Sequence, residues 1–431
     1  MYSYRSVFAS LVFVMGLPAW AVAPTEPPQT ASASTAAAHN NPELRTFVQR
    51  VWNESPAVQG AHAAVDAASA RSEGSASPLH NPSLELDAER TDINTTTIGL
   101  TQTIDWSDKQ GALRRVADQD VLVMKAQLEQ VRQDIAAETL AALARFYTAR
   151  ETQALARRGS QLMSGFANAA KRRQIAGDVE ALDVTLAEVA YGEALMALAA
   201  SESELAEAEA ALQAVSGLVD IQWPALPDEL AAPPDAIDPS WLEGLPELII
   251  LRRSADAANA RLDLAKREGR VDPTIGLRAG REDTETLVGL SIEIPLFVRN
   301  DYSSSARAAA HDVVAEEQAY RDAYRRANAR LSGALGRYKN ATRAWRAWLT
   351  TGRDAQREQM DLLEKLWAAG ELSATDFLVQ SKQNIDTQAA ATALNGQVWE
   401  AAIAWLSAAG QIERWLGFET ANNALNLGAS K

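Results

Sequence analysis

Residues 82–106 read PSLELDAERTDINTTTIGLTQTIDW, and the alternation of apolar and polar side chains in this stretch is the main clue to the architecture. In residues 83–90, leucine and alanine alternate with acidic side chains, so an extended chain has one apolar and one acidic face. In residues 95–106, isoleucine and leucine alternate with threonine in the same way. The two runs, joined by a short polar loop, predict a β-hairpin.

The pattern returns in residues 273–281 and 287–295, which predict a second hairpin. Strands of this length suit either a half-buried soluble sheet or an outer-membrane wall, whose strands need roughly 9 to 11 residues to span the bilayer. Alternation would place one set of carboxylates toward the lumen of such a wall, where they either select cations or keep the lumen wet: Glu85, Asp87, Glu89 and Glu293.

The prolines show where long helices can form. All 16 lie at or before Pro295, and none falls between Ser83 and Trp223. The proline-free stretches are rich in alanine, leucine, glutamate, glutamine and arginine, which favour helices. We therefore expect a mainly α protein with a small β part and two long helical arms, at residues 107–216 and 297–412. Gly159 and Gly165 are points where the first long helix can bend.

The N-terminus resembles a targeting signal. Arg5 precedes an apolar run that is too short to span a bilayer, and two Ala-x-Ala frames follow it. We expect residues 1–23 to be a secretory signal peptide, cleaved after Ala21 or Ala23, and residues 24–40 to be a flexible lead. No later apolar run in the sequence is as long as a membrane span, so membrane insertion is expected to use the strands.

The composition limits the function. The chain has no cysteine, which excludes disulfides and a lipidated N-terminal cysteine. Without Arg5, 40 basic residues stand against 56 acidic ones, a net charge of −16, which argues against nucleic acid as a partner. His39, His62, His80 and His311 are scattered, so no zinc or copper site, cofactor or enzymatic chemistry is expected.

The chain is a duplicated unit. Pro82 and Pro273 are 191 residues apart, Gly99 and Gly289 are 190 apart, and both Gly177–Gly370 and Asp183–Asp376 are 193 apart. The near-constant offset predicts two copies of helix, hairpin, long helix and return helix. A first helical segment (41–81) precedes the first hairpin and a second (244–272) precedes the second hairpin. Asn41-Pro42-Glu43-Leu44 and Leu245-Pro246-Glu247-Leu248 are taken as equivalent helix starts. A proline-rich linker (217–243) joins the units, and a C-terminal tail (413–431) ends the chain.

Four strands leave two open sheet edges, which hydrocarbon does not tolerate. In a membrane the chain would have to associate: two copies give an eight-stranded barrel and three copies a twelve-stranded one. Trp106 and Phe297 occupy matching strand-to-helix joints, where they are either membrane-interface aromatics or ordinary core aromatics.

These features resemble the TolC-type outer membrane efflux proteins over essentially the whole mature chain. The joints GLTQTIDW (99–106) and SIEIPLFVRN (291–300) carry the resemblance, and the second is similar to that of the cobalt-zinc-cadmium resistance (CzcC-like) branch. The resemblance implies a homotrimer with a 12-stranded transmembrane β-barrel and an α-barrel through the periplasm of a Gram-negative bacterium. It also implies a periplasmic membrane-fusion adaptor and an inner-membrane RND pump as partners, and outer membrane lipid around the barrel.

The resemblance also assigns roles to the helical turns. The family's tips, which dock the adaptor, match Ala176, Gly177, Asp178 and Val179, and Ala369, Gly370, Glu371 and Leu372. An aspartate six residues after each glycine lies near the family's tunnel entrance, which implicates Asp183 and Asp376. Three copies of Asp376 would attract cations; the alternative is that both aspartates only stabilise helix starts. Val379 and Leu372 stand where the family has an acid and a basic gate residue, so the resemblance does not extend to those links.

The sequence therefore favours a passive outer-membrane exit duct, with divalent heavy-metal cations as the expected cargo. Drugs, dyes or a secreted polypeptide are the alternative cargo for the same architecture. A soluble periplasmic coiled-coil adaptor, with the hairpins packed as a soluble sheet, is the remaining alternative.

Overall fold

The computed structural model describes residues 41–90, 94–219, 222–227 and 230–418. The predicted signal peptide and flexible lead lie outside the described residues, as does the predicted tail beyond residue 418.

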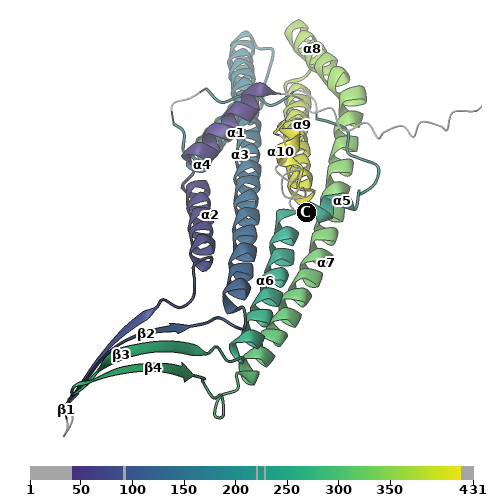
Figure 1. Cartoon of the computed structure of the whole chain (residues 1–431). Coiled ribbons are helices and arrows are strands. Elements are labelled where there is room, and N and C mark those ends of the chain that lie inside the picture. Colours follow the sequence, from purple (N-terminus) through teal and green to yellow (C-terminus); the bar gives the residue numbers. More distant parts are fainter. Residues whose placement is uncertain (1–40, 91–93, 220–221, 228–229, 419–431) are drawn as a thin grey trace, which may run out of the picture. The chain divides into compact units, whose positions relative to one another are not determined.

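The described chain is mainly helical, with one small antiparallel sheet, as the sequence predicts (Figure 1). The strands are β1 (Ser83–Arg90), β2 (Asn94–Thr103), β3 (Thr274–Glu282) and β4 (Glu285–Glu293). The helices before and after the first hairpin are α1 (Pro42–Glu54), α2 (Pro56–Ser75), α3 (Lys109–Ala176) and α4 (Ala181–Ser216). The second half holds α5 (Ser240–Glu243), α6 (Pro246–Glu268), α7 (Ser303–Ala347), the π-helical segment η1 (Trp348–Gly352), α8 (Arg353–Ala369), α9 (Ala374–Ala408) and α10 (Ile412–Trp415).

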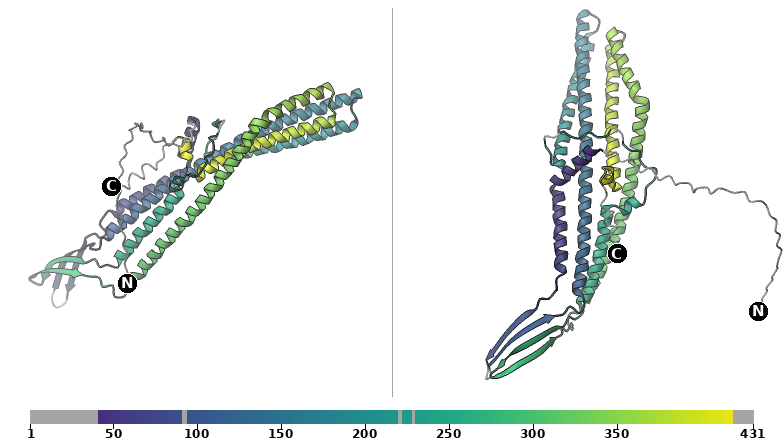
Figure 2. Two further views of the ribbon diagram at one scale, coloured as in Figure 1. Left: turned by 90° about the vertical axis from the view of Figure 1, so that its right-hand side faces the viewer. Right: turned by 45° about the horizontal axis from the view of Figure 1, so that its top comes forward.

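Long helices packed side by side form the body of the molecule (Figures 1 and 2). The 68 residues of α3 extend over about 100 Å at 1.5 Å per residue. This helix contacts α2, α4, α6 and α9, while α7 packs against α6 and α9. The first half of the chain is thus held to the second along much of its length.

The two arms differ in continuity. Helix α3 runs without interruption through Gly159 and Gly165, so neither glycine ends the helix. In the second arm, by contrast, η1 separates α7 from α8. A Cβ on Gly352 would clash with the indole ring of Trp348, so a larger residue at this position would force that ring to move.

The sheet has the strand order β1-β2-β3-β4, and all neighbours are antiparallel. The central pair, β2 and β3, joins the two hairpins over nine residue pairs, from Thr95–Glu282 to Thr103–Thr274. Strands β1 and β4 are therefore the two free edges of the described sheet.

The repeat is visible in the backbone. Helices α4 and α9 begin 193 residues apart, and each follows a turn with a glycine in the left-handed region, Gly177 (φ 86°) and Gly370 (φ 78°). Before the hairpins the register differs from the one taken from the sequence. The last helix before the first hairpin, α2, starts at Pro56, so Pro56 and not Pro42 is the counterpart of Pro246. Pro42 and Pro56 both start helices, so the local sequence does not show which of them corresponds to Pro246. Only the distance from each proline to the hairpin distinguishes them.

By length and composition, α4 is apolar enough to cross a membrane. The sequence analysis predicted no such segment after the signal peptide. The apolarity of α4 comes largely from alanine. Along its length α4 packs against α3, and near the helical turns Val184 and Ala187 join a buried cluster with side chains of α3, α8 and α9.

Candidate channel wall and tunnel entrance

The sheet carries continuous apolar rows on one face. Pairing across all four strands aligns Leu84, Leu100, Leu277 and Leu290 in one row and Leu86, Ile98, Ala279 and Val288 in the next. These side chains are exposed, as the 65% of Leu84 and 67% of Leu290 illustrate. A contiguous apolar surface of this kind on a single chain marks an interaction with a membrane or a partner.

The other face is polar and more shielded. In β2, Thr95, Thr97 and Gly99 are half-buried or buried, whereas the alternate side chains of Ile98 and Leu100 are exposed. The polar face is therefore the inner side of the curved sheet. The predicted lumen carboxylates Glu85, Asp87, Glu89 and Glu293 all belong to this face by register.

A basic residue that the sequence reading did not single out shares the polar face. Arg278 lies in the row Glu85, Gly99, Arg278, Gly289. The alternation in the sequence places Arg278 on the same face of its strand as Thr274. Which residues of the neighbouring strands lie beside Arg278, however, depends on the strand register.

The joint between β2 and α3 is built on Asp272, which precedes β3. One oxygen, Oδ1, accepts hydrogen bonds from the backbone N–H groups of Trp106 and Ser107 (both 3.1 Å) and from Ser107 Oγ (2.6 Å). The other, Oδ2, lies 2.8 Å from Lys109 Nζ. Burial disfavours the charged form, but the bonds from Lys109 and Ser107 outweigh it and hold the pKa of Asp272 below its ordinary value. The carboxylate thus fixes the first repeat to the second.

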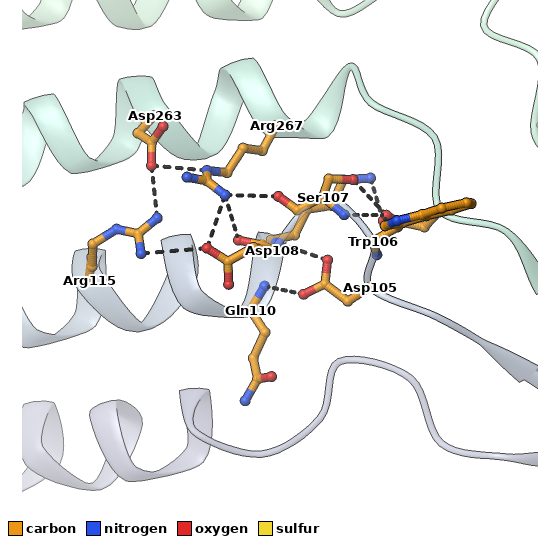
Figure 3. Close-up of polar contacts among 10 residues, drawn as sticks. Asp105, Trp106, Ser107, Asp108, Gln110, Arg115, Asp263 and Arg267 are labelled. Atoms are coloured by element: carbon orange, nitrogen blue, oxygen red, sulfur yellow. Dashed lines mark hydrogen bonds and ion pairs between the residues drawn. The ribbon is translucent and has the colours of Figure 1, made fainter.

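A second set of contacts supports the same joint from α6 (Figure 3). Arg267 Nη1 donates to the Ser107 carbonyl (2.9 Å) and to Asp108 Oδ2 (3.0 Å), while Arg267 Nε donates to Asp263 Oδ2 (3.0 Å). Asp105 accepts from the first two amides of α3, at 2.8 and 2.7 Å, and so occupies the positive end of that helix. The direction in which α3 leaves the sheet is fixed by side chains from both repeats.

The two joints share a backbone feature. Asp108 (φ 56°) and Tyr302 (φ 58°) are both left-handed, and each directly precedes its long helix. The predicted interface aromatics nevertheless differ. The side chain of Trp106 is 78% exposed, whereas Phe297 is half-buried and packs edge-on against Tyr302 at 5.3 Å between ring centroids. Only Trp106 presents its ring fully to the surroundings.

The helical turns have the geometry expected of glycine. At the end of α3, Asp178 N donates to the Arg173 carbonyl (2.9 Å), and at the end of α8, Glu371 N donates to the Leu366 carbonyl (3.0 Å). Both are the 6→1 bonds of a Schellman motif, which requires the positive φ of the glycine between them. The predicted docking residues of both turns are exposed except for Val179 and Leu372, which are half-buried.

One arginine links the two turns to each other. Arg173 Nη2 donates to the Trp367 carbonyl at 2.7 Å, and its guanidinium lies 4.3 Å from the centre of the Trp367 ring. Trp367 in turn stacks on Phe377 at 5.1 Å, within the cluster that joins α3, α4, α8 and α9. The four helix ends therefore form one packed tip.

Both predicted entrance aspartates stabilise helix starts. Asp183 Oδ2 accepts from the Glu180 N–H (3.2 Å) in a capping box. Asp376 Oδ2 accepts from Ser373 Oγ (2.6 Å), and Ser373 Oγ accepts from the Asp376 N–H (3.1 Å). Asp183 is half-buried, while Asp376 is exposed. Asp376 thus has a free surface in addition to its capping bonds.

A concave patch lies further along α9, lined by Val379, Lys382, Gln383, Asp386, Thr387 and Ala390. Lys382 Nζ forms an ion pair with Glu193 Oε2 of α4 at 2.7 Å. In the part of the chain that the structure describes, no group of three or more His, Asp or Glu side chains is arranged to hold a metal ion.

Comparison with known proteins agrees with this architecture. Residues 47–218 match the family model described as "Outer membrane efflux protein". The cobalt-zinc-cadmium resistance protein CzcC of Cupriavidus metallidurans is 29% identical over 233 residues, which cover 52% of this chain and 56% of CzcC. The match thus spans little more than half the length of that relative.

Solved structures match over a larger share of the chain. The CmeC outer membrane channel of Campylobacter jejuni covers 90% of this chain and 89% of its own, with a TM-score of 0.73 at 12% identity. CusC covers 85% of this chain and 92% of its own, with a TM-score of 0.70 at 14% identity. The fold of this chain is that of these channels.

The resemblance to TolC-type outer membrane efflux proteins, including CzcC, is therefore confirmed. The localisation to the outer membrane that the sequence led us to expect is confirmed by the same matches. These relatives are described as efflux proteins and channels, in agreement with the expectation that the chain is not an enzyme.

Proposed function

We propose that this chain forms, as a homotrimer, the outer membrane channel of a tripartite efflux system. The observation that carries the proposal is a four-stranded sheet with one exposed apolar face, one polar inner face and two free edges, joined directly to long helices. Three copies would close twelve strands into a barrel with the apolar rows toward lipid. The helical arms would continue the wall into the periplasm.

Passive conduction is the role that this architecture supports. The helical tips would dock a periplasmic membrane-fusion adaptor, through which an inner-membrane RND pump delivers cargo. The exposed residues around Gly177 and Gly370 are suited to that contact, because they lie at the turns that end the helical arms.

Divalent heavy-metal cations are the proposed cargo. The similarity to CzcC supports this choice, as does the acidity of the polar face at Glu85, Asp87, Glu89 and Glu293. Recognition of a particular metal would belong to the pump. The duct would only have to favour cations, which rings of carboxylates do.

Membrane fractionation tests the channel itself. The expressed chain is expected in the outer membrane, and after mild detergent extraction it should run as a trimer. Recovery as a soluble periplasmic monomer would contradict the proposal and support the adaptor alternative.

Growth assays test the cargo. A strain lacking this chain is expected to lose tolerance to at least one of zinc, cadmium, cobalt, copper and nickel, and the full-length chain should restore it. Unchanged metal tolerance together with lost drug tolerance would overturn the metal assignment while leaving the channel in place.

Ion selectivity tests the entrance. In planar bilayers, Asp376→Asn is expected to lower the preference for cations, because three like charges around the axis are removed. Asp183→Asn tests the equivalent aspartate of the first arm, which is less exposed. Equal selectivity of the wild type and Asp376→Asn would remove the proposed entrance role.

A further inference from the structure

Arg278 is the basic residue on an otherwise acidic part of the polar face. Its row across the sheet reads Glu85, Gly99, Arg278, Gly289. Both strands beside Arg278 thus carry a glycine at the paired position. The side chain has room to lie flat toward either neighbour.

The side chain lies over β4. A Cβ built on Gly289 would be 2.7 Å from Arg278 Nε and 3.0 Å from Arg278 Cγ. On the other side, the atom of Arg278 nearest to a Cβ built on Gly99 would be its Cβ, at 3.7 Å, and no atom further along the side chain is among the near neighbours. The arginine therefore extends across Gly289 toward the free edge of the sheet.

The described part of the chain offers no strand beyond that edge. In the order β1-β2-β3-β4 of the described sheet, β4 is the last. Because Nε already stands over β4, the guanidinium ends at the edge itself, and none of the ion pairs between described residues involves Arg278. Its own Glu85 is two strands away in the opposite direction, roughly 10 Å at the usual strand spacing.

The opposite edge carries the complementary charge. On β1 the polar face presents Glu85, Asp87 and Glu89 at alternate positions, and all three are exposed. A second copy that pairs its β1 with this β4 would bring these carboxylates beside the guanidinium. Since side chains repeat every two residues, several registers that keep the polar faces together bring one of the three acids near Arg278.

We propose that Arg278 is an intermolecular clasp, pairing across the seam with a carboxylate of β1 in a second copy of this chain. The inference rests on the proposed trimer and adds the residue that matches one edge to the other. Without Arg278, the seam would join three acids of β1 to a β4 whose polar face also carries Glu285 and Glu293. Arginine suits this role, since its fork binds carboxylates in a fixed geometry.

The test is the dissociation rate of the purified trimer in mild detergent, followed on semi-native gels at fixed temperature. For Arg278→Ala we expect about tenfold faster dissociation, the combined effect of three solvent-exposed pairs. Arg278→Glu should dissociate faster still. Arg281→Ala is the matched control, because Arg281 lies on the same strand with the opposite phase, and its rate should equal that of the wild type.

Charge exchange identifies the partner. Each of Glu85→Lys, Asp87→Lys and Glu89→Lys is combined with Arg278→Glu, and one combination is expected to restore at least half of the lost stability. If Arg278→Glu does not insert into the membrane, the salt dependence of the wild type and Arg278→Ala gives the same information: only the wild-type trimer should dissociate faster at high salt.

The outcomes separate the clasp from the channel. A stable wild-type trimer whose dissociation rate is unchanged in Arg278→Ala overturns the clasp and leaves the channel intact. A faster rate that none of the three lysine variants rescues also overturns it. A wild-type chain that forms no trimer overturns the proposed function and the clasp together.

Discussion

Replacing Asp272 by alanine should loosen the joint between the sheet and α3. The substitution removes the acceptor of three hydrogen bonds at Oδ1 and the partner of Lys109 at Oδ2. Removing one partner of a buried ion pair costs about 3–5 kcal/mol. The Lys109 side chain is 18% exposed, so partial rehydration places the expected local cost near the lower end, at about 3 kcal/mol.

Hydrogen–deuterium exchange measures this cost where it arises. The amides of Trp106 and Ser107 donate to Asp272, and a local cost of about 3 kcal/mol corresponds to exchange roughly 100-fold faster. Asp301→Ala is the control: Asp301 accepts from Ser303 N–H (3.1 Å) and Ser303 Oγ (2.8 Å) at the second joint, so exchange at the first joint should not change. Exchange at residues 106–107 that rises less than about threefold in Asp272→Ala would refute the role assigned to this carboxylate.

The pH dependence of the same joint has a definite sign. The pKa of Asp272 is lowered in the folded chain, so its stabilisation is present above the unfolded-state value of about 4 and is lost as the pH falls through the folded-state value. The protection of the Trp106 amide in the wild type, taken relative to the intrinsic exchange rate at each pH, should therefore fall below about pH 4. In Asp272→Asn the carboxyl titration is absent, and this loss of protection should disappear.

Three further predictions concern the tip and the arms. Gly370→Ala should destabilise the chain by about 1 kcal/mol, because the φ of 78° at this position is strained for alanine. Gly192→Ala should instead stabilise it by about 0.5–1 kcal/mol, because Gly192 lies in mid-helix and an added Cβ would have no other atom within 4 Å. Thermal unfolding of the detergent-solubilised chain distinguishes the two effects. Arg173→Ala should cost about 1–2 kcal/mol through its lost contacts with α8 and should raise exchange in the second turn, and unchanged exchange there would contradict the link. The ion pair with Glu193 raises the pKa of Lys382, so its stabilisation is present below about pH 10 and is lost above the raised value; the Lys382→Met variant should lack this alkaline step in its unfolding temperature.

The alternation and the repeat offsets were sufficient to predict the strands, the faces of the sheet and the two helical arms. Successive side chains of residues 83–90 point to opposite faces because a β-strand is pleated. Gly177 and Gly370 stand at equivalent positions because both turns require a residue with positive φ. Such local rules can be applied to a sequence without knowing what packs against what.

The contacts that depend on distant residues could not be predicted in this way. Asp272 reaches Ser107 across 165 positions, and nothing in either local sequence indicates the pairing. The position of the Arg278 side chain over Gly289 likewise could not be predicted without the register between β3 and β4. The mistaken equivalence of Pro42 and Pro246 has a related cause, since a helix-start signal says nothing of how far the helix runs toward the hairpin.

Fusion of the two repeats in one chain reduces the number of strand–strand seams that must form between separate chains. Six separate hairpins closing a twelve-stranded barrel would meet at six seams between chains. In this chain, β2 and β3 form one of every two seams within a single chain, through a nine-pair ladder that ends beside a 2.8 Å hydrogen bond between the hydroxyls of Thr103 and Thr274. Asp272 reinforces the same internal seam from outside the sheet. A threefold barrel would then leave three seams between chains, all of the β4–β1 type, and their specificity must come from groups at those edges. Arg278 on one side and three alternating carboxylates on the other meet that requirement.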